Sequence, residues 1–163
     1  MRMLLFLLLV AHPALAQSQD AVSVLERREI ALESGAASPA PELRLTLAYL
    51  DASGWTPEII VAAAQASAWI LAQCGISLRS AELVHVTAPA RFRDFFTPLS
   101  RELAQTLALG KPTLYFVHGT RQRPAFDAEA IGRGNSRSRP ELRDSVWITR
   151  GTRDLHIAVA HEL

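Results

Sequence analysis

The residues whose types and spacing could do chemistry stand at the end of the chain, in His161-Glu162-Leu163. A helix that holds catalytic zinc carries two histidines four residues apart, with a glutamate directly after the first. The helical period turns this glutamate about 100° from the histidine, so it reaches a metal-bound water and not the metal. His161 and Glu162 match the first half of the pattern, and the second histidine would lie beyond Leu163. The sequence therefore predicts His161 as a zinc ligand and Glu162 as a general base.

The residues just before this pair suit a zinc helix. From Leu155 to Ala160 the chain has no Asp, Glu, Lys or Arg, and apart from His156 it is apolar. Apolar surroundings control solvent access to a metal site and keep its ligands in place. A His-Glu pair can also occur by chance in a chain of this length, so a coincidental pair is the alternative.

With this motif at its end, the chain resembles the zincin metallopeptidases, and more particularly the N-terminal subdomain of a metzincin. The resemblance implies a twisted mixed sheet that is mostly parallel, a long helix, an antiparallel edge strand that holds the substrate backbone, and a terminal active-site helix. It also implies Zn²⁺ as the cofactor and a peptide or protein as the substrate. Under this resemblance a glycine-bearing stretch falls at the substrate-binding edge, namely Ile131, Gly132, Arg133 and Gly134. The other zinc ligands and the methionine turn would lie beyond Leu163, so we expect a truncated chain that is inactive alone.

Strand and helix patterns alternate along the chain. Apolar residues at every second position predict a strand over 43–49. Thr56 and Pro57 supply an N-cap and a first-turn proline, and they predict a helix to Cys74 that Gly75 ends. Further strands are predicted at 76–86 with an interruption at 80–82, at 112–117 and at 145–149, and further helices at 97–109 and from Asp154 onward. This order predicts an α/β domain with a mostly parallel sheet over residues 42–163.

The N-terminal segment has the features of a secretory signal peptide. Arg2 precedes an apolar run over 3–11, and Ala14-Leu15-Ala16 offers a small-residue cleavage site. We expect residues 1–16 to be removed before Gln17 and the protein to be secreted or periplasmic; a retained membrane anchor is the alternative. Residues 17–41 are predicted to be a flexible segment and linker, in which 22–32 could form a short helix.

Composition excludes some partners and covalent features. The chain has 17 basic and 16 acidic residues, so no charge excess favours nucleic acid. After the predicted signal peptide, no other apolar stretch is long enough to cross a membrane, so no stable membrane anchor is predicted once the signal is cleaved. A single cysteine, Cys74, rules out an internal disulfide, and its apolar neighbours predict a buried, inert thiol.

Three functions are consistent with these patterns. The first is an exported zinc-dependent endopeptidase that hydrolyses peptide bonds with a zinc-activated water. The second is a non-catalytic exported α/β binding module in which His161-Glu162 is coincidental. The third is a hydrolase of the zincin fold that acts on a non-protein substrate, because fold and motif alone do not select the substrate.

Overall fold

The computed structural model describes residues 21–35, 41–121, 130–132 and 140–163. Within these ranges the chain forms six strands and three α-helices, with three short 3-10 turns between them. In chain order the elements are β1 (Ser23–Ala31), β2 (Glu42–Leu50), α1 (Pro57–Gln73), β3 (Ser77–Thr87), α2 (Thr97–Leu107), β4 (Thr113–Phe116), β5 (Ala130–Gly132), β6 (Ser145–Ile148) and α3 (Leu155–Glu162). The signal peptide and the cleavage site predicted at 1–16 lie outside the described residues, as do residues 17–20 and 36–40 of the predicted flexible segment and linker.

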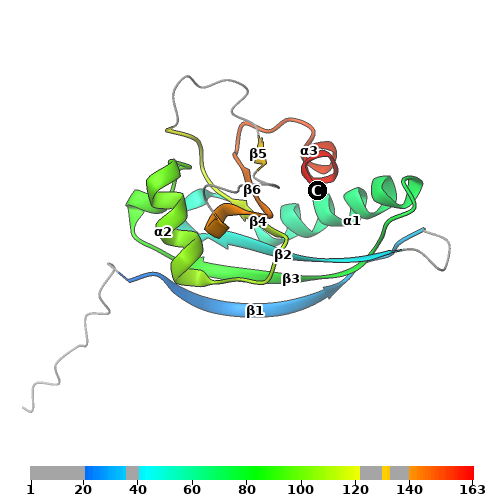
Figure 1. Ribbon diagram of the computed structural model, residues 1–163, viewed down its shortest axis with the longest axis horizontal. Coiled ribbons are helices and arrows are strands. Elements are labelled where there is room, and N and C mark those ends of the chain that lie inside the picture. Colours follow the sequence, from blue (N-terminus) through cyan, green and yellow to red (C-terminus); the bar gives the residue numbers. More distant parts are fainter. Residues whose placement is uncertain (1–20, 36–40, 122–129, 133–139) are drawn as a thin grey trace, which may run out of the picture.

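The strands form one mixed sheet in the order β1-β3-β2-β4-β6-β5 (Figure 1). The four central strands, β3, β2, β4 and β6, are parallel to one another. The two outer strands, β1 and β5, pair antiparallel with their neighbours. The predicted α/β class with a mostly parallel sheet is therefore confirmed.

Strand β1 corrects the sequence prediction for its segment. Residues 22–32 were predicted to form a short helix, but Ser23–Ala31 pairs with β3 along almost its whole length. Four consecutive charged residues, Glu26 to Glu29, are typical of an exposed helix face. In the structure two of them form ion pairs with residues of other strands: Arg27 with Glu82 at 3.0 Å and Glu29 with Arg44 at 2.8 Å. The sheet consequently begins well before Glu42, where the sequence placed the start of the domain.

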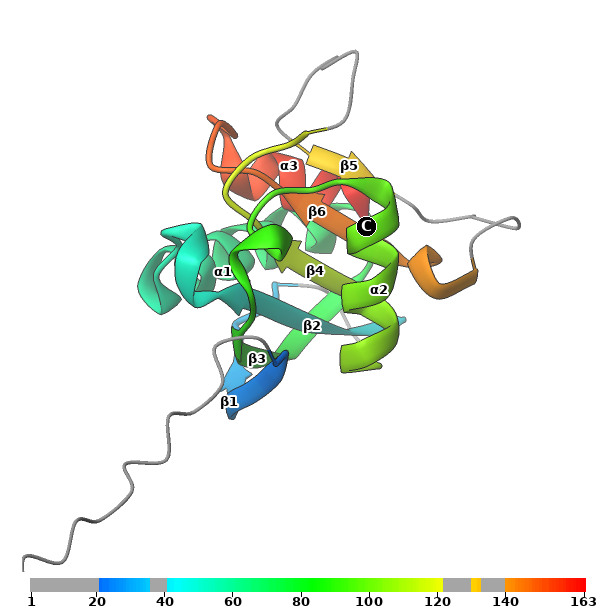
Figure 2. The same ribbon diagram turned by 90° about the vertical axis from the view of Figure 1, so that its left-hand side faces the viewer.

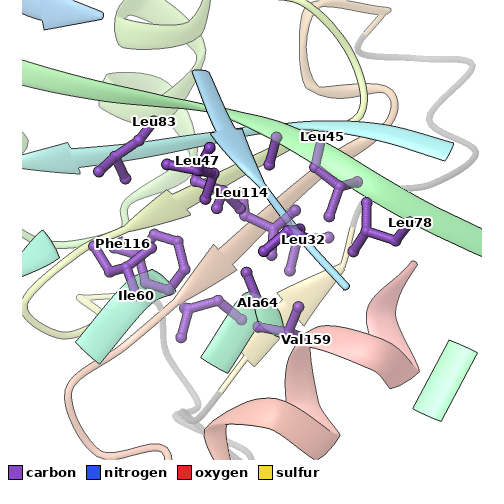
Figure 3. Packing of buried hydrophobic residues seen from close by; sticks show 14 of the residues in the cluster. Leu32, Leu45, Leu47, Ile60, Ala64, Leu78, Leu83, Leu114, Phe116 and Val159 are labelled. Atoms are coloured by element: carbon purple, nitrogen blue, oxygen red, sulfur yellow. The ribbon is translucent and has the colours of Figure 1, made fainter. Parts of the chain in front are cut away.

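The helices cover the sheet on both faces. In Figure 2, α2 lies in front of the sheet, and α1 and α3 lie behind it. Alternate residues of β2 supply the two cores: Leu45 and Leu47 face α1 and α3, whereas Ala48 and Leu50 face α2. Figure 3 shows the first core, in which Ile60 and Ala64 of α1 and Val159 of α3 meet the strand leucines.

The ends of the helices follow local chemistry. Pro57 is the first residue of α1, where its missing N–H costs no hydrogen bond. At the other end Gly75 has φ of 75°, in the left-handed region that glycine adopts without strain. Cys74 stands between the helix and this glycine, and it is exposed. The prediction of a buried thiol is therefore wrong, because the side chain lies beyond the last buried turn of α1.

Two further details differ from the sequence patterns. β3 runs unbroken through 80–82, because a register shift opposite Leu43 and Arg44 absorbs one extra residue. α2 ends at Leu107, and Ala108 takes the left-handed conformation (φ 45°), so the helix stops before Gly110. No helix in the described ranges is long and apolar enough to cross a membrane.

Candidate functional site at the end of helix α3

Helix α3 carries both predicted chemical residues in its last turn. The Asp154 carbonyl accepts hydrogen bonds from the N–H groups of Ile157 and Ala158, each at 2.9 Å, and this begins the helix. His161 is exposed, and Glu162 is partly buried beside it. As adjacent residues on a helix they point about 100° apart.

The helix is fixed to α1 by one apolar and one polar contact. Val159, 1 % exposed, enters the first core, where Leu155 and Ala160 pack beside it. Ser67, in the middle of α1, is fully buried, and its hydroxyl lies 2.8 Å from the carbonyl oxygens of both Ala63 and His156. A neutral hydrogen bond between buried groups contributes about 1 kcal/mol. These contacts set the position of the turn that ends in His161 and Glu162.

The strand next to α3 is the edge strand β5. Its residues pair antiparallel with β6, Ile131 opposite Trp147 and Gly132 opposite Val146. Residues of β5 also contact α3. Ile131 and Gly132 thus lie in an outer strand that contacts the helix carrying His161 and Glu162, and their role in holding a substrate stays a prediction. Arg133 and Gly134, predicted to belong to the same site, lie outside the described residues.

The described residues do not complete a zinc site. A catalytic zinc ion needs three protein ligands. In the described ranges no group of three or more His, Cys, Asp or Glu side chains could hold a metal. His161 therefore has the chemistry of a ligand but no second and third ligand beside it in this part of the chain.

A second cluster of polar side chains lies elsewhere, around Tyr49 and His85. The imidazole Nε2 of His85 is hydrogen-bonded to the Asp51 carboxylate, and its ring stacks on Tyr49 with centroids 4.6 Å apart. The sequence showed His85 only as a residue that alternates along a strand. A signal existed, since Tyr49 and His85 both lie in segments predicted to be strands, but their contact depends on the pairing of β2 with β3.

The comparisons with known proteins give no relative. No protein-family model matches the chain, and neither the curated proteins nor the solved structures yield a significant match.

Proposed function

We propose that this chain belongs to an exported zinc-dependent endopeptidase, in which His161 is one zinc ligand and Glu162 the general base. The observation that carries the proposal is the position of this pair, at the end of a helix that packs on the sheet beside an antiparallel edge strand. A substrate peptide would extend the sheet at β5, because an outer strand has backbone groups free to pair with an added strand. A zincin-like arrangement of sheet and helices is part of the proposal.

Each residue has a defined task in this proposal. The imidazole of His161 is a borderline ligand that suits Zn²⁺. The Glu162 carboxylate would accept a proton from the water that attacks the peptide carbonyl. The proposal requires two more zinc ligands from outside the described residues, since those within them do not form a three-ligand group.

The sequence of the encoding gene gives the first test. If the reading frame continues past Leu163, the proposal expects a histidine four residues after His161. A stop codon or a different residue at that position would contradict the peptidase hypothesis without any assay.

A second test compares Glu162→Gln with the unchanged protein, each prepared with its full reading frame. Loss of the general base should lower the rate of peptide hydrolysis by at least about 100-fold, while the zinc content measured by atomic emission should stay the same. Glu141→Gln is a matched control, because this carboxylate pairs with Arg101 beside α2 and lies away from α3. Equal rates for Glu162→Gln and the unchanged protein would contradict the proposed role.

The second candidate is a non-catalytic exported binding module. It is favoured by the lack of a metal-binding group in the described ranges and by a sheet that already carries helices on both faces. This candidate expects a cooperative melt of the present chain that neither zinc nor a chelator shifts. A rise in melting temperature with zinc, absent in His161→Gln, would favour the peptidase.

A further inference from the structure

A small pocket opens on the α1 face of the sheet, far along the strand order from β5. It has a volume of about 100 Å³ and is lined by Glu26, Arg28, Tyr49, Pro57, Glu58, Leu83 and His85. Three strands build it row by row: Glu26 of β1 lies opposite His85 of β3, and His85 opposite Tyr49 of β2. The first residues of α1, Pro57 and Glu58, border the same space.

The hydroxyl of Tyr49, which borders this pocket, makes no hydrogen bond within the described part of the chain. The residue is only 7 % exposed, and its ring stacks on His85 at an interplanar angle of 3°. Burial and the Glu26 carboxylate raise the pKa of this hydroxyl, Asp51 and Glu58 raise it further, and Arg28 opposes them. The hydroxyl is therefore in a negative potential and suits a ligand that donates an N–H. A hydroxyl that borders a pocket and has no bond within the described ranges can accept a hydrogen bond from a ligand in that pocket.

The charged groups around the pocket divide into engaged and unengaged ones. Asp51 is bonded to His85, and the Glu58 carboxylate interacts with its own backbone N–H and with Thr56, while the positive charge of Arg28 also acts on it electrostatically. Glu26 and Arg28 make no ion pair and no hydrogen bond in the described ranges. They stand two residues apart on one face of β1, a spacing of about 7 Å between Cα atoms. A negative and a positive side chain, neither of which forms an ion pair or a hydrogen bond within the described ranges, thus border the same small space.

We propose that this pocket binds a small α-amino acid as its zwitterion, with the ammonium group at Glu26 and the Tyr49 hydroxyl and the carboxylate at Arg28. Each half of such a ligand meets the opposite charge, and the pocket has room for only a short side chain. Charge-assisted hydrogen bonds are about twice as strong as neutral ones, so both charges contribute to affinity. The site uses neither His161 nor Glu162 and is independent of the proposed peptidase function.

The test is an amide chemical-shift titration by NMR with three matched probes: alanine, ethylamine and propionate. Ethylamine lacks the carboxylate of alanine, and propionate lacks its ammonium group. Alanine should bind with a Kd in roughly the millimolar range and shift the amides of Glu26, Tyr49 and His85. Each half-ligand should bind at least about tenfold more weakly, the factor that corresponds to one charged hydrogen bond.

Variants locate the two charges. Glu26→Gln and Arg28→Gln should each weaken alanine binding about tenfold or more, and Tyr49→Phe roughly threefold to tenfold. Glu29→Gln and Arg27→Gln are the matched controls, because they lie on the same strand but pair with Arg44 and Glu82 instead. The proposal is overturned if alanine causes no shifts up to about 50 mM, if ethylamine binds as tightly as alanine, or if a control variant weakens binding as much as its partner.

Discussion

At the scale of single residues, a few buried polar groups decide how the elements are held. Ser67 joins α1 to α3, Trp55 donates from its indole to the Val117 carbonyl at 2.8 Å, and Ser145 bonds the Leu142 carbonyl at 2.6 Å. Each joins a side chain to a backbone carbonyl in a buried or partly buried place. Their loss costs more than the loss of surface ion pairs, because the remaining partner cannot reach water.

Ser67→Ala tests the link between the two helices. The change leaves the His156 carbonyl without this partner and should lower the free energy of unfolding by about 1–2 kcal/mol. Amide exchange should accelerate in α3 more than in α2. Thr106→Ala is the control, since the Thr106 hydroxyl bonds only the Glu102 carbonyl within its own exposed helix turn. If both variants loosen α3 equally, or neither does, Ser67 does not hold the helix.

Tyr115 makes stability depend on pH in the alkaline range. Burial raises the pKa of Tyr115 to about 12, from an ordinary value of 10.0, and its ring stacks on Trp147 at 4.2 Å. The unfolded chain loses this proton first, so the contribution to stability is complete below pH 10 and is lost as the pH rises toward 12. Tyr115→Phe should show a smaller loss of urea stability between about pH 9 and pH 11. An unchanged pH dependence in the variant would contradict this assignment.

At the scale of elements, the sequence predicted those whose cause is local. Thr56 and Pro57 marked the start of α1, and continuous apolar runs marked β4 and β6, which are buried at every position. β1 was missed because nothing local makes it a strand: its partners lie on β3, some 55 residues away. The small pocket lined by Glu26, Arg28 and Tyr49 was missed for the same reason, because its residues come from β1, β2, β3 and α1. The His161-Glu162 pair could be recognised from the sequence because its two residues are adjacent in the chain.

The stability of β1 should come from its apolar contact and not from its ion pairs. Ile30 is 9 % exposed and belongs to the first core, whereas Arg27 and Glu82 remain 46 % and 31 % exposed. Ile30→Ala should cost about 2–4 kcal/mol of unfolding free energy, and Arg27→Gln less than about 1 kcal/mol. Urea unfolding followed by circular dichroism measures both. A larger cost for Arg27→Gln than for Ile30→Ala would show that charge pairing holds the strand.

At the scale of the whole molecule, one sheet serves two cores. The central strands contribute alternate residues to both, so a loss of packing on one face reaches the other through the same backbone. The order of elements predicted the α/β class and the mostly parallel sheet, whereas the two cores follow from the helices that the structure places on both faces. The further ligands that the proposed zinc site requires could not be predicted, because Glu162 and Leu163 are the residues given after His161 and neither is the expected histidine.

Core truncations on the two faces should therefore lower one shared transition. Leu47, in the first core, and Leu103, in the second, are both fully buried. Leu47→Ala and Leu103→Ala should each cost about 2–5 kcal/mol, with tryptophan fluorescence and far-ultraviolet circular dichroism giving the same midpoint. Two separate midpoints in either variant would mean that the faces unfold independently.

The long outer edge of β1 bears on how copies of this protein behave at high concentration. A nine-residue edge strand presents a row of backbone groups on which another chain could polymerise. Here the register shift between Val24 and Glu26 interrupts that row, and four consecutive charged side chains, Glu26 to Glu29, follow it directly. A second copy that paired with this edge would face an irregular strand and would have to desolvate the charged side chains. The strand that borders the sheet thus also carries two features, an irregular edge and a charged run, that disfavour edge-to-edge association of copies.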